Sequence, residues 1–169
     1  YAAMDWLLAR QGAIQKKLAS RHLREGGLVL YDLSSSYFEG STCPLAKRGY
    51  SRDGRPGTLQ VNYGLLTDAR GCPVAVSVFE GNTSDSLTFL PAVQRVRERF
   101  GLAQVVMVGD RGMVSQKAID ELRGQGGIDW ITALKSVSIR SLVEHGHLQL
   151  GLFDQRNLAE ITSPDYPGE

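Results

Sequence analysis

The sequence predicts a mixed α/β domain, in which helices cover one sheet of antiparallel and parallel strands. Three apolar runs, over residues 28–33, 59–67 and 73–80, have no helical pattern between them, which favours antiparallel pairing. Two later apolar runs each follow a helical pattern, as the crossover between parallel strands requires. The chain has 169 residues, 42% of them hydrophobic, and this is enough for one such core.

The expected elements follow one another in a clear order. A helix over residues 3–24 carries apolar residues at helical spacing and ends at a pair of glycines. The second and third strands form a hairpin, because residues 68–71 between them have the composition of a turn. The later elements are a helix over 86–100, a strand over 104–109, a helix over 115–124, a strand over 130–134, a short helix over 138–145 and a strand over 147–153.

Charge and composition exclude several classes of protein. The net charge of +1 gives no overall basic field, so any contact with nucleic acid must come from local patches. Cys43 and Cys72 lie far apart and form no CxxC or Cys/His cluster, so we expect no structural zinc site and a reducing cytoplasm. We find no signal peptide or long apolar span, and so expect no membrane partner. Because the chain starts at Tyr1 and ends in a turn-rich run, we expect a fragment.

Asp32 requires a chemical explanation. It follows the apolar run 28–31, and an ionised carboxylate inside such a strand is costly unless it is paired or binds a metal. One interpretation is a capping aspartate at the strand end, bonded to the backbone of the serines that follow. The other is a metal ligand, and the strand alone does not decide between them.

The segment over residues 41–58 is rich in glycine and in basic residues. Its cations face only Asp53 as an opposing charge, and its glycines and proline keep the backbone irregular. Such a segment either lies along a phosphate backbone, where each cation displaces a counterion, or is a solvated loop. The candidate DNA-contacting residues are Lys47, Arg48, Arg52 and Arg55.

Asp110 ends a second apolar strand in the same way as Asp32. If the two strands are parallel neighbours, both carboxylates reach one region at the carboxyl ends of the strands, where such folds bind ligands. Two carboxylates repel each other unless one is protonated or a cation lies between them. Hard oxygen ligands in an open site suit Mg²⁺ or Mn²⁺, and two such ions about 3.5–4 Å apart support phosphodiester chemistry.

No equally convincing third acid follows a strand. Glu80 and Asp85 are near the expected region, but Asp85 is more simply a cap at the start of a helix. Glu121 is expected on a solvated helix face. The three histidines, which are His22, His145 and His147, form no ligand pattern with the aspartates.

An aspartyl-phosphate phosphatase is a rival interpretation of the strand that ends in Asp32. These enzymes place a general acid two positions after the nucleophilic aspartate, and here that position is Ser34. The later strand ending in Asp110 imitates their metal-binding motif, but residues 111–114 contain no second acid. The missing general acid makes this interpretation the weaker one.

Four motifs in order resemble the DDE transposases of bacterial insertion sequences. The resemblance covers most of the chain, from about Met4 to Glu169. No single motif is decisive, but four in register are specific. They are Tyr31-Asp32-Leu33-Ser34-Ser35-Ser36-Tyr37-Phe38-Glu39-Gly40, Lys47-Arg48-Gly49-Tyr50-Ser51-Arg52-Asp53-Gly54, Val78-Phe79-Glu80-Gly81-Asn82-Thr83 and Val108-Gly109-Asp110-Arg111-Gly112-Met113.

The resemblance implies a ribonuclease-H-like catalytic core, with Asp32 and Asp110 as the first and second catalytic acids. The family's third acid is a glutamate on a later helix in a Tyr/Arg/Glu/Lys pattern, which this chain lacks. We therefore expect that acid beyond residue 169. We assign it to none of the late glutamates, which include Glu144, Glu160 and Glu169. The implied organisation is a helical segment over 1–26, a core lacking its C-terminal part over 27–136, and the start of an insertion or extension over 137–169.

The implied activity is metal-dependent cleavage and strand transfer of the DNA ends of a mobile element. Its cofactor would be Mg²⁺ or Mn²⁺, and its partner would be double-stranded DNA. The protein could act as a homodimer in the DNA complex. The alternative is a remnant that binds DNA but cannot cut it, because the third acid is missing.

Overall fold

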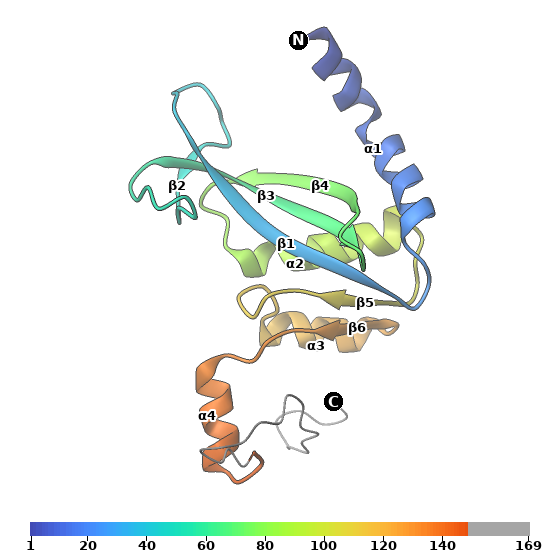
Figure 1. Ribbon diagram of the computed structural model, residues 1–169, viewed down its shortest axis with the longest axis vertical. Coiled ribbons are helices and arrows are strands. Elements are labelled where there is room, and N and C mark those ends of the chain that lie inside the picture. Colours follow the sequence, from blue (N-terminus) through green and yellow to red (C-terminus); the bar gives the residue numbers. More distant parts are fainter. Residues whose placement is uncertain (149–169) are drawn as a thin grey trace. The chain divides into compact units, whose positions relative to one another are not determined.

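The computed structural model describes residues 1–148 of the chain (Figure 1). The chain divides into two compact units, Tyr1–Thr132 and Ala133–Glu169. In the second unit the structure describes helix α4 (Ser136–Glu144), which agrees with the short helix expected there, and Leu142 is its buried residue. The strand expected over 147–153 lies almost entirely outside the described residues.

The first unit is built on a mixed sheet. Strands β1 (Gly27–Phe38), β3 (Leu59–Asp68) and β4 (Pro73–Glu80) pair antiparallel, while β5 (Val105–Val108) and β6 (Ile128–Ile131) join β1 in parallel. Across the sheet the order is β4, β3, β1, β5, β6, which is the ribonuclease-H-like arrangement that the family resemblance implies. A short strand that we did not expect, β2 (Lys47–Arg48), pairs with the start of β3.

Strand β1 is longer than the sequence predicts. We expected it to end at Leu33, but it continues through the serines to Phe38, because β3 runs beside it as far as the pair Phe38↔Leu59. The ladder of hydrogen bonds to β3 thus outweighs the weak strand preference of three consecutive serines. As a result, Asp32 lies in the middle of a strand rather than at its end.

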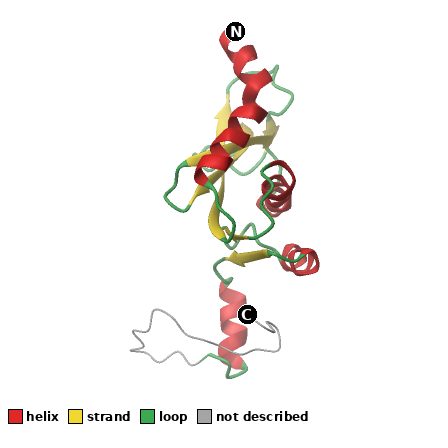
Figure 2. Ribbon diagram, turned by 90° about the vertical axis from the view of Figure 1, so that its right-hand side faces the viewer, coloured by secondary structure: helices red, strands yellow, loops and turns green. Residues whose placement is uncertain are grey.

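The core lies between one face of the sheet and the helices α2 (Asp85–Gln94) and α3 (Gln116–Gln125), which lie on one side of the strands (Figure 2). A π-helical turn, Arg95–Arg99, extends α2, so the helix expected over 86–100 is confirmed with altered geometry in its last turn. Alternate residues of β1 point into this core, namely Val29, Tyr31, Leu33 and Ser35. Asp32 has the opposite parity and is exposed on the other face.

Helix α1 (Ala2–His22) confirms the expected N-terminal helix, and its first turns are exposed. It meets the sheet at β4, where the Gln15 side chain donates a hydrogen bond to the Val76 carbonyl oxygen at 3.3 Å. The Arg95 side chain donates to the same carbonyl at 3.0 Å. The free edge of β4 is thereby partly covered. Among residues 1–148 no helix is long and apolar enough to cross a membrane.

Candidate active site

Asp32 is positioned by the middle of β1 with its carboxylate on the exposed face. Its Oδ1 accepts a hydrogen bond from the next backbone amide, Leu33 N, at 2.8 Å. The interpretation of Asp32 as a strand-end cap is wrong, because the serines after it are paired with β3 in the same strand.

Asp110 follows the last residue of β5 by two positions, at the start of a tight turn. Gly109 N donates to the Ile131 carbonyl at 3.1 Å and ties the end of β5 to β6. The Asp110 carboxylate accepts from Arg111 N at 2.7 Å, and its carbonyl accepts from Met113 N at 2.9 Å. These bonds fix the backbone around Asp110 while the residue itself is exposed.

The two aspartates belong to adjacent parallel strands and stand at the same register level. Leu30 faces Val108 in the last residue pair between β1 and β5, and each aspartate follows two residues later. Adjacent strands lie about 4.8 Å apart, so Asp32 and Asp110 start from neighbouring backbone positions. Beyond this level β5 has ended and β1 continues, so among the described residues no strand pairs with that side of β1 next to Asp32.

A cavity of about 690 Å³ opens beside Asp110. Its wall consists of residues from the basic segment, from β3, from the connection between β4 and α2, and from the turn after β5. They include Tyr50, Arg52, Asn62, Thr83, Asp85 and Gly112. Asp32 is not one of the described residues that line it. The cavity therefore joins Asp110 to segments that are far apart in the sequence.

Asp85 does not have the role that the sequence predicts. The N-cap of α2 is Ser84, and the Asp85 carboxylate accepts a hydrogen bond from Arg52 Nη2 at 2.7 Å. As the first residue of the helix, Asp85 still lies where the helix dipole favours a negative charge. The interpretation of Asp85 as a helix cap is thus wrong. The sequence also did not predict its ion pair with Arg52 in the wall of the cavity.

More cations of the basic segment over residues 41–58 have acidic partners than we expected. Arg52 pairs with Asp85, and Arg55 lies 3.6 Å from Glu39 and 4.1 Å from the centre of the Tyr37 ring. The prediction that its cations face only Asp53 is therefore wrong. Within residues 1–148, Lys47 and Arg48 on β2 form no ion pair and are exposed.

Gly49 and Gly81 allow the backbone of the basic segment to pack directly on the backbone that follows β4. Gly81 N donates to the Leu45 carbonyl at 3.0 Å, and the backbone at Gly49 packs directly on Gly81. A Cβ atom at Gly49 would overlap the Gly81 carbonyl oxygen, and one at Gly81 would overlap the Gln60 carbonyl oxygen. Only residues without a side chain fit this crossing.

Further polar groups lie on the sheet face that carries Asp32 and in the wall of the cavity beside Asp110. Ser36 and the Tyr63 hydroxyl are 3.3 Å apart on the sheet face that carries Asp32, and hydrogen bonds with Ser34 and Ser36 lower the pKa of Tyr63. Asn62 is 2% exposed and donates to the Thr83 carbonyl at 3.0 Å, while its Oδ1 is buried without a partner among the described residues. The alternation of residues along β3 could have predicted which sheet face Asn62 and Tyr63 occupy, but not the groups that they bond to.

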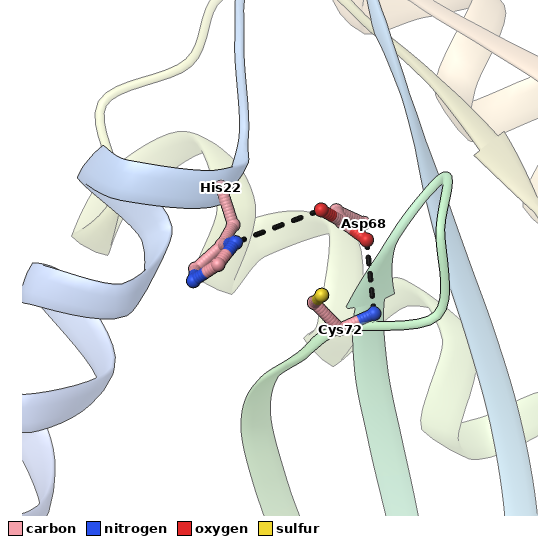
Figure 3. Close-up of side chains that lie close together, drawn as sticks. All are labelled: His22, Asp68 and Cys72. Atoms are coloured by element: carbon pink, nitrogen blue, oxygen red, sulfur yellow. Dashed lines mark hydrogen bonds and ion pairs between the residues drawn. The ribbon is translucent and has the colours of Figure 1, made fainter.

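A separate group joins His22, Asp68 and Cys72 at the far end of β3 (Figure 3). The ligand atoms of these three side chains lie within 4.8 Å of one another. The sequence analysis considered the histidines only with Asp32 and Asp110, and so did not predict that His22 would meet Asp68. The expectation that neither cysteine belongs to a Cys/His cluster is wrong for Cys72.

The family model of the transposase DDE domain matches residues 26–158. The chain belongs to this family. The match includes all of β1 and the turn that holds Asp110. No curated protein matches the chain.

Solved structures similar to this chain include transposase complexes. The piggyBac transposase synaptic complex with hairpin DNA has 13% identity and a TM-score of 0.48, over 67% of this chain and 24% of that chain. The Mos1 transposase paired-end complex with the left transposon end has 11% identity and a TM-score of 0.41, over 81% and 54%. A pre-cleavage Mos1 transpososome has 15% identity and a TM-score of 0.38, over 81% and 48%. The chain thus spans between about a quarter and about half of these proteins.

Proposed function

We propose that this chain carries part of the catalytic core of a DNA transposase, which cleaves the ends of a mobile element and joins them to target DNA. The observation that carries the proposal is the placement of Asp32 and Asp110 at one register level on neighbouring parallel strands. The family match supports it independently. We also propose, following the resemblance, that the element is a bacterial insertion sequence and that the protein acts in the cytoplasm.

The two carboxylates suit a divalent cation. Both residues are exposed, and Oδ1 of each accepts a hydrogen bond from the backbone amide that follows it. Among residues 1–148 no hydrogen bond engages Oδ2 of either aspartate, so each offers a hard oxygen ligand of the kind that Mg²⁺ and Mn²⁺ prefer. When bound, such ions would activate an attacking oxygen and stabilise the leaving one.

Double-stranded DNA is the proposed partner, with two copies of the protein in the complex. Lys47 and Arg48 project from an edge strand without an opposing charge, so we assign them to phosphate contacts that position the DNA without reading its sequence. Arg52 and Arg55 were candidates for the same role, but each already has a carboxylate partner. We propose that Arg52, whose ion pair is the less exposed one, mainly holds the basic segment in place, and that Arg52 and Arg55 contact phosphates only after leaving their partners.

Cleavage by variants of the full-length protein tests the proposal. We expect Asp32→Asn and Asp110→Asn each to lower Mg²⁺-dependent cleavage of element-end DNA by at least about a thousandfold, or about 4 kcal/mol in the barrier. Asp129→Asn is the matched control, because Asp129 is an exposed aspartate on the neighbouring strand β6, paired with Val106. Normal cleavage by either of the first two variants would contradict the proposed site.

A gel-shift with the same DNA separates the transposase from the alternative of a DNA-binding remnant. If the wild-type protein shifts the DNA but produces no cleaved end with Mg²⁺ or Mn²⁺, binding without cleavage is its function. We expect Lys47→Ala with Arg48→Ala to weaken the shift and to make it less dependent on salt, by about one counterion for each phosphate that the variant no longer touches. Turnover of a small phosphomonoester would instead favour the phosphatase interpretation.

A further inference from the structure

His22, Asp68 and Cys72 come from three different elements that meet at one corner of the sheet (Figure 3). His22 is the last residue of α1, Asp68 is the last residue of β3, and Cys72 directly precedes β4. Asp68 is opposite Val29, whose side chain faces the core, whereas Asp32 faces away from the core. The group is therefore distinct from the candidate active site, and a binding role for it is independent of the proposed function.

The Asp68 carboxylate is held in place by its own turn. Asp68 is 4% exposed, and its carboxylate oxygens accept hydrogen bonds from Arg70 and Cys72. Oδ1 accepts from the amides of Arg70 and Cys72, both at 2.9 Å, and so holds the turn. Oδ2 interacts with the Arg70 side chain, and lies 3.6 Å from His22 Nδ1. The oxygen that faces the histidine is thus the one that the turn does not require.

Arg70 also lies against His22. Nη2 of Arg70 lies 3.3 Å from His22 Nδ1, on the same ring nitrogen that faces Asp68 Oδ2. The guanidinium therefore stands where a cation shared by His22 and Asp68 would be bound. An imidazole nitrogen is the metal ligand that proteins use most often.

We propose that His22, Asp68 and Cys72 form a binding site for a zinc-type cation, with Arg70 as the counter-ion that takes its place in the metal-free protein. Nitrogen, oxygen and sulfur ligands together suit Zn²⁺, whereas thiolates disfavour hard ions such as Mg²⁺. Asp68 and Cys72 are separated by three residues in a tight turn, a spacing that zinc sites commonly use for a ligand pair.

The geometry requires only a small closure of the group. Zinc–ligand distances of about 2.0–2.3 Å place tetrahedral ligand atoms roughly 3.3–3.8 Å apart, so atoms now within 4.8 Å of one another must approach by about 1 Å. The Arg70 side chain is 72% exposed, so it can swing into solvent when the cation binds. Three protein ligands leave a fourth position for water. Binding would tie the C-terminal end of α1 to the β3–β4 turn.

Titration of the full-length protein with Co²⁺, followed by displacement with Zn²⁺, tests the site. Cobalt bound to a thiolate in tetrahedral geometry has a characteristic visible and near-ultraviolet absorption, which reports sulfur ligation directly. We expect this absorption in the wild type and its loss in Cys72→Ser. Cys43→Ser is the matched control, because Cys43 is also free and half-buried but has no part in the group, and it should keep the absorption.

Two further variants separate a metal site from a purely structural ion pair. His22→Gln should weaken Zn²⁺ binding at least tenfold, and Zn²⁺ should raise the melting temperature of the wild type more than that of this variant. Arg70→Ala removes the competing cation and should tighten Zn²⁺ binding, by up to about fivefold for an exposed ion pair. The proposal is overturned if the cobalt spectrum is the same in wild type and Cys72→Ser, or if Arg70→Ala binds Zn²⁺ more weakly than wild type.

Discussion

Replacing Asp85 by asparagine should loosen the basic segment over residues 41–58 while leaving the fold intact. The substitution removes the charge that holds Arg52 across the cavity beside Asp110, and it changes neither the size of the side chain nor its ability to accept a hydrogen bond. The bond is short, at 2.7 Å, but the Arg52 and Asp85 side chains are 24% and 36% exposed. An ion pair in such a position contributes about 0.5–1 kcal/mol.

The consequence can be measured by limited trypsin digestion. The segment contains Lys47, Arg48, Arg52 and Arg55 as cleavage sites, and cleavage in the native protein requires the segment to open locally. A loss of about 0.5–1 kcal/mol should raise the cleavage rate after Arg52 about two- to fivefold. The melting temperature should fall by no more than about 4 °C, because one such pair is a small part of the total.

The matched control is Glu39→Gln, which breaks the other ion pair of the segment. Arg55 and Glu39 lie 3.6 Å apart with side chains that are 53% and 79% exposed, so we expect less than about a twofold change in cleavage. The reasoning is refuted if Asp85→Asn leaves the cleavage rate at the wild-type value. It is also refuted if Glu39→Gln accelerates cleavage as much as Asp85→Asn does, because the Arg52 pair would then have no special part in anchoring the segment.

Two other predictions concern stability. Phe89→Ala should lower the free energy of unfolding by about 3–5 kcal/mol in urea titrations, because the ring is completely buried between α2 and the sheet; a loss below about 1 kcal/mol would mean that the core is packed differently. Hydrogen bonds from Ala103 N and Gln104 N lower the pKa of Glu25, so its contribution is present at neutral pH and is lost as the pH falls through that lowered pKa. Glu25→Gln should therefore show a smaller fall in melting temperature on acidification below about pH 5 than the wild type, and equal slopes would contradict this assignment.

Short-range patterns were sufficient to predict the order of the main elements, although not the short strand β2. The alternation in β3 and β4, with a polar turn between them, predicted the hairpin. The apolar run before Asp110 predicted β5, because a parallel strand inside a covered sheet needs no polar alternation. The length of β1 was not predictable from Ser34 to Ser36 themselves, because the partner strand decides it.

Contacts between distant segments were beyond the reach of the sequence. Arg52 and Asp85 are 33 residues apart, and nothing in either segment specifies the other. His22 precedes Asp68 by 46 positions, and only the meeting of α1 with the β3–β4 turn brings the two side chains together. The same limit applies to Gly49 and Gly81, whose small size is explained only by the crossing of their backbones.

If DNA is the partner, as proposed, the charges around the candidate active site favour a bound cation before the DNA binds. Arg52 and Asp85 neutralise each other in the cavity wall, which leaves the carboxylate of Asp110 as the remaining charge among the described residues that line the cavity. Asp32 adds a second negative charge at the same register level of the sheet. A phosphodiester would therefore approach two carboxylates, and this is unfavourable unless a cation offsets them. Lys47 and Arg48 lie on β2, which pairs with the first residues of β3, Leu59 and Gln60. Asp32 is opposite Leu65, farther along β3. The two cations can therefore attract the DNA without directly neutralising Asp32 or Asp110. On this argument DNA binding through β2 should persist without divalent ions, whereas placement of the phosphodiester between Asp32 and Asp110 should require them.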